Sequence, residues 1–128
     1  MSSRRELVRM LLLNEICDDY ENLAVSIEMP IMERGGRCGL YVDKGEIVRA
    51  LQELVELGLA RPYRLHGDGR PNWAEEMERM PSLEEMESPD GAWFFRTEAG
   101  LEAQLADWKP WPFDDDDELR KDWTPPES

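Results

Sequence analysis

The helix predicted over residues 43–58 constrains the fold of this chain more than any other segment. Its apolar residues recur at the three- and four-residue spacing of one helix face; they are Ile47, Leu51, Leu54 and Val55. Asp43 with Glu46 three residues later is typical of a helix start, and Gly58 suits the left-handed residue that closes a helix. An extended segment, residues 59–65, follows at once. The pattern therefore predicts a helix that runs directly into a strand.

Another helix is predicted near the start of the chain. Ser3 and Glu6 form a capping-box pattern, in which the serine hydroxyl accepts from the Glu6 backbone N–H while the carboxylate reaches back. The apolar stripe that follows is wider than one packing face requires; it comprises Leu7, Val8, Met10, Leu11, Leu12, Leu13 and Ile16. We expect this helix either to be deeply buried or to be shared with a second subunit.

A shorter helix is predicted between these two. Its apolar residues keep helical spacing; they are Tyr20, Leu23, Ala24 and Ile27. Pro30 is expected to end it, because proline lacks the N–H that a helix interior uses. Residues 33–37 contain two glycines and are interpreted as a loop, and residues 40–42 as a short strand.

Residues 59–65 and 92–96 are predicted to pair as the two strands of a hairpin. Pro62 cannot donate to a sheet, so the first strand is expected at an edge or with a bulge. The long connection, residues 66–91, holds two short acidic pieces that each suit a helical turn; they are residues 73–80 and 82–87.

Thr97 is placed to cap a last helix over residues 98–108, in which Leu101, Leu105 and Trp108 keep a single apolar stripe. The predicted fold is therefore mainly α with a small antiparallel β-hairpin, an α+β arrangement. Its length suits one domain. We assign that domain to residues 1–109, with residues 66–91 as an insertion in the hairpin, and residues 110–128 to an acidic, partly disordered tail.

The surplus negative charge is concentrated in two segments. The chain has a formal net charge of -14. Residues 66–91 contain 8 acidic and 2 basic residues, and residues 110–128 contain 7 acidic and 2 basic residues. A field of this sign repels phosphates and anionic lipid headgroups and favours basic partners or solubility. It argues against a nucleic-acid-binding surface in those two segments.

Two strings carry a resemblance to a known family. They are Ile47-Val48-Arg49-Ala50-Leu51-Gln52-Glu53-Leu54-Val55-Glu56-Leu57-Gly58-Leu59-Ala60-Arg61 and Trp93-Phe94-Phe95-Arg96-Thr97-Glu98-Ala99-Gly100-Leu101. With the order of elements around them, they resemble winged-helix domains of the MarR and PadR type over about residues 4–108. The first looks like that family's recognition helix entering the hairpin, and the second like the return strand of the wing entering the next helix. Each string also has a plain explanation in glycine and threonine capping.

The resemblance implies a DNA-reading face on the third helix and a phosphate-binding wing. Carried over by position, the reading face comprises Lys44, Glu46, Arg49, Ala50 and Glu53, and the wing contributes Arg70 and Arg79 among eight acids. This departs from the family's chemistry, because phosphate contacts need several cations. The cations near that face are Arg34, Arg37, Lys44, Arg49, Arg61 and Arg64; we take Lys44, Arg49, Arg61 and Arg64 as the candidate nucleic-acid face.

The tail is a candidate partner-binding segment. Its residues of interest are Trp111 and Phe113, followed by the acidic run Asp114, Asp115, Asp116, Asp117 and Glu118. A continuous aspartate run lacks the spaced ligands and central glycine of an EF-hand, so solvated disorder or partner binding is expected. The aromatic residues are expected to pack on the core rather than face outward.

No pattern in the sequence points to catalysis. His66 with Asp68 is interpreted as a solvated turn, because no second histidine or nearby cysteine accompanies it. The carboxylates considered as an acid and base pair are interpreted as a solvated face; they are Glu75, Glu76, Glu84 and Glu85. We expect no enzyme, no cofactor and no metal site.

The cellular setting is inferred from composition. No apolar run is long enough to span a bilayer or to form a signal-peptide core, so we expect a cytoplasmic protein without a membrane partner. Cys17 and Cys38 lack CxxC spacing and suit free thiols in a reducing compartment.

Three functions remain open. The leading hypothesis is a non-enzymatic regulatory or adaptor protein on a winged-helix scaffold that binds a basic protein partner. The alternative is a DNA-binding transcriptional regulator whose acidic segments are autoinhibitory. The third is a DNA mimic that occupies another protein's DNA-binding groove. A homodimer is expected in addition, with the first and last helices as its interface.

Overall fold

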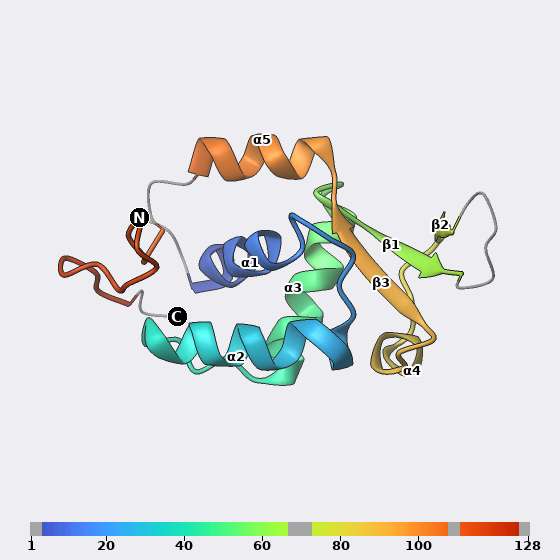
Figure 1. Ribbon diagram of the computed structural model, residues 1–128, viewed down its shortest axis with the longest axis horizontal. Coiled ribbons are helices and arrows are strands. Elements are labelled where there is room, and N and C mark those ends of the chain that lie inside the picture. The colour runs from blue at the N-terminus through green and yellow to red at the C-terminus, as the bar shows by residue number, and fades with distance from the viewer. Residues whose placement is uncertain (1–3, 67–72, 108–110, 126–128) are drawn as a thin grey trace.

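The computed structural model describes residues 4–66, 73–107 and 111–125 (Figure 1). This part of the chain forms helices, a π-helical turn and a three-stranded antiparallel sheet in the order β2-β1-β3. The α-helices are α1 (Arg4–Glu15), α2 (Glu28–Arg37), α3 (Lys44–Glu56), α4 (Leu83–Glu87) and α5 (Glu98–Asp107). The π-helical turn is Leu23–Ile27, and the strands are β1 (Ala60–Leu65), β2 (Ala74–Glu76) and β3 (Ala92–Arg96). The α+β class with a small antiparallel sheet is confirmed.

Helix α1 lies at the centre of the core. It is sandwiched between α5 on one side and α2 on the other, with α3 crossing behind it (Figure 1). Every residue of its wide apolar stripe is buried; these are Leu7, Val8, Met10, Leu11, Leu12, Leu13 and Ile16. The first of the two expectations for this helix, deep burial, therefore accounts for the stripe. The homodimer stays a prediction, but α1 offers it no apolar surface.

The second helical segment is longer than the sequence predicts. Pro30 does not end it, and the expected loop over residues 33–37 is wrong, because α2 continues to Arg37. Pro30 is the third residue of α2, and the π-helical turn Leu23–Ile27 runs directly into this helix. The Glu28 N–H still makes a π-helical hydrogen bond to the Leu23 carbonyl, so the missing N–H of Pro30 falls where π-helical bonding changes to α-helical bonding. The two glycines are tolerated in the last turn, which closes when the Gly35 carbonyl accepts from the Leu40 N–H at 2.7 Å.

The strand expected over residues 40–42 is also wrong. The Leu40 N–H is used by α2, and the Tyr41 carbonyl accepts from Arg4 at 3.3 Å instead of a strand partner. The residue that pairs with the sheet comes earlier in the chain. Glu21 exchanges two backbone hydrogen bonds with Phe94 of β3, at 3.0 and 2.7 Å. This bridge fixes the connection between α1 and α2 to the edge of the sheet.

The junction from α3 into β1 forms as predicted. The Asp43 side chain accepts from the Glu46 N–H at 2.8 Å, and Gly58 has a φ of 75°, which a residue with a Cβ rarely adopts. Thr97 joins the far end of the hairpin to this point: its hydroxyl donates to the Gly58 carbonyl at 2.7 Å and accepts from the Gly100 N–H at 3.0 Å. One residue thus caps α5 and ties it to the end of α3.

The position of Pro62 differs from the expectation of an edge strand or a bulge. β1 is the central strand, and Pro62 lies opposite Phe94 of β3 in a regular ladder. The Pro62 carbonyl faces β2 and accepts from the Met77 N–H at 2.9 Å, just beyond the last residue of β2 that pairs. Its ring nitrogen faces the same side, so no ladder hydrogen bond to β3 is lost.

The connection between β1 and β3 is partly regular. The first acidic piece supplies β2 rather than a helical turn, and it pairs with β1 from Tyr63 to Leu65. The second piece forms α4, with a complete capping box between Ser82 and Glu85. The insertion therefore packs beside the sheet and the start of α3. None of the described helices has both the length and the apolar character needed to cross a bilayer.

Candidate functional site

The cations near the expected nucleic-acid face are the natural place to look for a site. We call them the cationic set: Arg34 and Arg37 on α2, Lys44 and Arg49 on α3, and Arg61 and Arg64 on β1. If they bound phosphates, their charged groups would have to be available to a ligand. The structure instead shows what already occupies them.

Three members of the cationic set pair with the acidic insertion. Lys44 forms an ion pair with Glu87 of α4, and this contact raises the pKa of the lysine. Arg61 pairs with Glu76 of β2 at 3.1 Å. The third pair joins Arg64 to Glu85 of α4 at 3.2 Å. The insertion is therefore an acidic cover over Lys44 of α3 and over Arg61 and Arg64 of β1.

Two further members pair with the acidic tail. Asp117 accepts from Arg34 at 2.9 Å and from Arg37 at 3.5 Å. Both guanidinium groups also lie over the ring of Phe113, at 5.3 and 4.8 Å from its centroid. Cation–π contact and ion pairing together fix the tail to the last turn of α2.

Arg49 is the exception. It is exposed, and within residues 4–66, 73–107 and 111–125 it has no ion pair. Its exposed neighbours on α3 are Gly45, Gln52 and Glu56. A single arginine on this face gives little attraction for a phosphate backbone.

The reading face carried over from the winged-helix resemblance is partly wrong. Ala50 and Glu53 are buried, because this side of α3 packs against α1. Glu53 is bound by Arg5 and lies 3.7 Å from Arg9, and Glu46 is bound by Arg4 at 2.9 and 3.0 Å. A small hollow of about 180 Å³ between α1 and α3 is lined by Arg4, Arg5, Val8, Glu46, Arg49, Ala50 and Glu53. Of the wing arginines, Arg79 pairs with Glu85 at 3.0 Å, and Arg70 lies outside the described residues.

The structure describes the tail from Trp111 to Pro125, and its expected partial disorder stays a prediction. Trp111 and Phe113 are buried, so neither presents an apolar surface to a partner, and the expected packing of these aromatic residues is found. Trp123 donates from Nε1 to the Cys38 carbonyl at 2.9 Å. Trp108, the third tail-side aromatic residue, lies outside the described residues.

The acidic run of the tail forms a turn. The Asp114 carboxylate accepts from the N–H groups of Asp116 and Glu118 at 2.9 and 3.0 Å. Asp117 stands at a φ of 59° within this turn, which aims its carboxylate at the two arginines of α2. Asp115 and Asp116 remain exposed. Only part of the run expected to bind a partner is therefore available.

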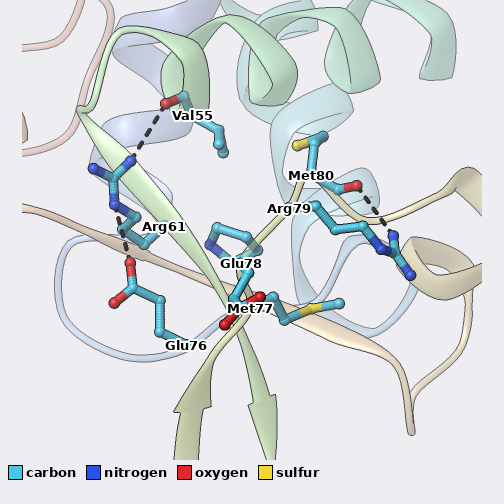
Figure 2. Close-up of a pocket in the computed structure, with 8 residues that line it drawn as sticks. Val55, Arg61, Glu76, Met77, Glu78, Arg79 and Met80 are labelled. Carbon is cyan, nitrogen blue, oxygen red and sulfur yellow. Dashed lines mark hydrogen bonds and ion pairs between the residues drawn. The ribbon is translucent and has the colours of Figure 1, made fainter.

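A cavity of about 500 Å³ lies between the end of α3, β1 and the chain that follows β2 (Figure 2). Its apolar surface comes from Val55, Pro62, Met77 and Met80. Arg61 turns to the Val55 carbonyl and to Glu76, while Arg79 turns to the Met80 carbonyl at 3.3 Å (Figure 2). Both arginines are already paired within the chain. Glu78 also lines the cavity, and its carboxylate is exposed to solvent.

The carboxylates weighed as acid and base do not form a catalytic pair. Glu85 is held by the Ser82 backbone N–H and by Arg79, and these contacts lower its pKa, the reverse of what a general acid needs. Glu75 contacts the His66 ring at 2.9 Å, while Asp68 lies outside the described residues. No three metal-binding side chains converge anywhere in residues 4–66, 73–107 and 111–125. Cys17 and Cys38 are free thiols.

Sequence reasoning identified the cationic set and the acidic segments separately and missed that they pair. The partners are about 15 to 80 residues apart along the chain, as for Arg61 with Glu76 and Arg34 with Asp117. The distribution of charge gave one usable signal: residues 66–91 hold 8 acidic against 2 basic residues and residues 110–128 hold 7 against 2, whereas residues 1–65 hold 11 against 9.

Comparison of the chain with models of known protein families, with curated proteins and with solved structures returns no significant match.

Acidification is expected to release the tail. Burial acts to raise the pKa of Asp117, but hydrogen bonds and charge from Arg34 and Arg37 outweigh it, so the pKa lies below its ordinary value. A lowered folded-state pKa means that the contact stabilises docking above the ordinary carboxyl pKa, and that this stabilisation is lost as the pH falls through the lowered value. The Trp123 indole N–H signal, followed by NMR from neutral to acid pH, should move to its undocked position.

The matched variants are Asp117→Asn and Asp115→Asn. Asparagine tolerates the left-handed backbone at position 117, so the first variant removes the charge without straining the turn. It should leave the tail weakly docked already at neutral pH, whereas Asp115→Asn should behave as wild type. Identical titrations of the Trp123 signal in wild type and Asp117→Asn would contradict the role given to this carboxylate.

Proposed function

We propose that this chain is a non-enzymatic regulatory or adaptor protein on a winged-helix scaffold, and that it binds a basic protein partner rather than DNA. The proposal rests on one observation: the charged groups of the cationic set are already engaged in ion pairs within the chain. Five of its six members pair with carboxylates of the acidic insertion or the tail, at Glu76, Glu85, Glu87 and Asp117. What faces outward from these segments is their remaining negative charge.

The order of elements supports the winged-helix scaffold. Three helices precede the strands, and α3 runs into β1 through Gly58 as a recognition helix runs into a wing. Glu21, between α1 and α2, adds a one-residue bridge to β3. The turn between α2 and α3 contains Gly39 at a φ of 83°, and a glycine is common in the turn of a helix-turn-helix unit.

Electrostatics supports a protein partner over DNA. Binding a duplex would require the chain to break its own ion pairs and bring the displaced carboxylates close to phosphates. Unpaired carboxylates of the insertion are already exposed, among them Glu78, Glu84 and Asp90. A basic surface gains from these charges, because opposite potentials steer association and suppress wrong partners.

An autoinhibited DNA-binding regulator is the second candidate, favoured by one specific observation. The carboxylates of the insertion pair with Lys44, Arg61 and Arg64, three of the four cations of the candidate nucleic-acid face. If the insertion can move away, those cations become available together with Arg49. The two candidates therefore differ in whether removing the cover creates DNA binding.

A gel-shift titration with a random-sequence duplex at low salt separates them. The uncovering variant is the triple substitution Glu76→Gln, Glu85→Gln and Glu87→Gln, in which glutamine at position 85 keeps a capping-box residue. Its matched control neutralises the same number of exposed, unpaired carboxylates through Glu78→Gln, Glu84→Gln and Asp90→Asn. We expect no shift with wild type, with the uncovering variant or with the control.

Two outcomes would contradict the adaptor. Salt-sensitive binding by wild type would make the chain an ordinary DNA-binding protein. A duplex shift by the uncovering variant, with none by the matched control, would establish the autoinhibited regulator in its place. Equal weak shifts by both variants would show that DNA binding depends on net charge alone, and not on which carboxylates are removed. That outcome would be compatible with the adaptor function.

A further inference from the structure

Helix α5 is turned the opposite way from an ordinary surface helix. Its large apolar side chains face solvent: Leu101 is 40% exposed and Leu105 is 72% exposed. Its buried side is made by Gly100 and by the polar residue Gln104, which is only 3% exposed. A surface helix of a globular protein places its apolar stripe toward the core. Two members of the apolar stripe predicted for this helix, Leu101 and Leu105, are therefore exposed, and the described part of the chain does not bury them; the third, Trp108, lies outside the described residues.

Specific contacts hold α5 in this orientation. A Cβ on Gly100 would stand 2.3 Å from the Leu59 carbonyl oxygen, so only glycine permits the close approach of α5 to the start of β1. The buried Gln104 side chain accepts from Arg96 of β3 at 2.5 Å. Turning the leucines inward would break this hydrogen bond and remove Gly100 from its contact. The outward leucines are thus a consequence of contacts that the fold makes elsewhere.

The exposed ridge is acidic at its margins. Glu98, Leu101, Glu102 and Leu105 are all exposed, and each leucine lies three residues after one of the glutamates. The helix contains three acidic residues, Glu98, Glu102 and Asp107, and no lysine or arginine. The surface is therefore a narrow apolar strip beside carboxylates, on a helix that lies on the opposite side of α1 from α2 (Figure 1).

We propose that this ridge is the docking surface for a basic amphipathic helix of a partner protein. The proposal rests on the proposed function and names the site and the partner class for it. Charge complementarity selects the occupant: lysines or arginines beside an apolar stripe would meet Glu98 and Glu102, while the stripe covers Leu101 and Leu105. A second copy of α5 would bring carboxylates against carboxylates.

The test uses the full chain and a labelled synthetic helix with leucines at helical spacing and lysines beside them. Binding is followed by fluorescence anisotropy at low and high salt. The variants are the pair Leu101→Ala and Leu105→Ala, and the pair Glu98→Gln and Glu102→Gln. Alanine and glutamine keep the helix because both have high helix propensity. The matched control is Leu57→Ala with Leu83→Ala, two leucines that are 56% and 50% exposed elsewhere on the molecule.

We expect wild type and the control pair to bind alike, and the leucine pair on α5 to lose about tenfold or more in affinity, as expected for central apolar contacts. The glutamine pair should weaken binding and flatten its salt dependence. A helix with glutamates in place of the lysines should not bind. Absence of binding by wild type, or equal losses in the α5 and control pairs, would overturn the proposal.

A second copy is the competing occupant, and light scattering of the free chain detects it. A dimer that becomes a monomer in the Leu101→Ala and Leu105→Ala variant would assign the ridge to self-association and overturn the basic helix. That result would not contradict the proposed adaptor function, because the DNA titration tests that function and light scattering does not. Each of the two proposals can therefore be contradicted without the other.

Discussion

Replacing Phe94 with alanine is expected to lower the free energy of unfolding by about 3–5 kcal/mol, the cost typical of deleting a fully buried aromatic ring. Phe94 is the largest of the fully buried side chains in the described core. Its backbone also joins three segments, because it pairs with Pro62 of β1 on one side and bridges to Glu21 on the other. Loss of the ring therefore weakens the point at which the helices meet the sheet. Urea unfolding followed by circular dichroism measures the change.

Phe95→Ala is the neighbouring control. Successive residues of a strand face opposite sides of the sheet, and Phe95 is half-buried on the outer side, with its ring 4.9 Å from that of Tyr20. We expect it to cost about 1 kcal/mol, in the range of an aromatic pair on a sheet face. Equal costs for the two substitutions, or the larger cost at Phe95, would show that β3 presents the other face to the core.

Replacing Asn22 with alanine is expected to cost roughly 2–4 kcal/mol, because it removes four hydrogen bonds that are each worth about 1 kcal/mol net. Asn22 is fully buried. Its Oδ1 accepts from the N–H groups of Ala24 and Val25 at 3.0 and 3.1 Å, which starts the π-helical turn. Its Nδ2 donates to the carbonyls of Ser88 and Ala92 at 2.9 and 2.8 Å, which ties the insertion to that turn.

Two comparison variants separate the roles of this side chain. Asn22→Asp keeps an oxygen for the two N–H groups but places a carboxylate oxygen against the carbonyls of Ser88 and Ala92, so it should destabilise at least as much as alanine at neutral pH. Ser26→Ala alters only a half-buried neighbour whose hydroxyl accepts from the Asn22 N–H at 3.1 Å, and it should cost less. Thermal unfolding ranks the stabilities of the three variants. If Asn22→Ala unfolded at the same temperature as wild type, Asn22 would not have this structural role.

Elements set by local chemistry could be predicted from the sequence. Asp43, Gly58 and Thr97 act on backbone groups within a few residues, so their identity and spacing indicate where α3 ends and α5 begins. The strand over residues 92–96 is predicted as well. The wide apolar stripe of α1 predicts either deep burial or a shared interface, and the structure shows the stripe buried.

Elements set by distant partners could not be predicted. A proline in a regular helix interior is expected to end the helix, and the sequence does not show that a π-helical turn leads into α2 just before Pro30. The third strand could not be foreseen, because β2 is short and acidic and depends on β1 for its pairing. Residues 40–42 have strand composition, but no strand is in reach of them.

In the candidate sites too, local features could be predicted from the sequence and contacts with distant residues could not. Periodicity predicted that α5 has an apolar stripe, yet it cannot tell which side of a helix meets the core. That is decided by the contact of Gly100 with Leu59 and by the Gln104–Arg96 hydrogen bond. Likewise, charge counts located the acidic segments but could not show that Lys44 lies against Glu87.

The pairing of Lys44, Arg61 and Arg64 with the insertion has a consequence for ionic strength. These contacts are solvent-exposed, so added electrolyte weakens them. The same ions also weaken any attraction between those cations and a nucleic acid. No salt concentration is therefore high enough to break these ion pairs and also low enough for the cations to bind a phosphate backbone. Freeing them usefully would require a competing polycation or a chemical change that removes negative charge from Glu76, Glu85 and Glu87.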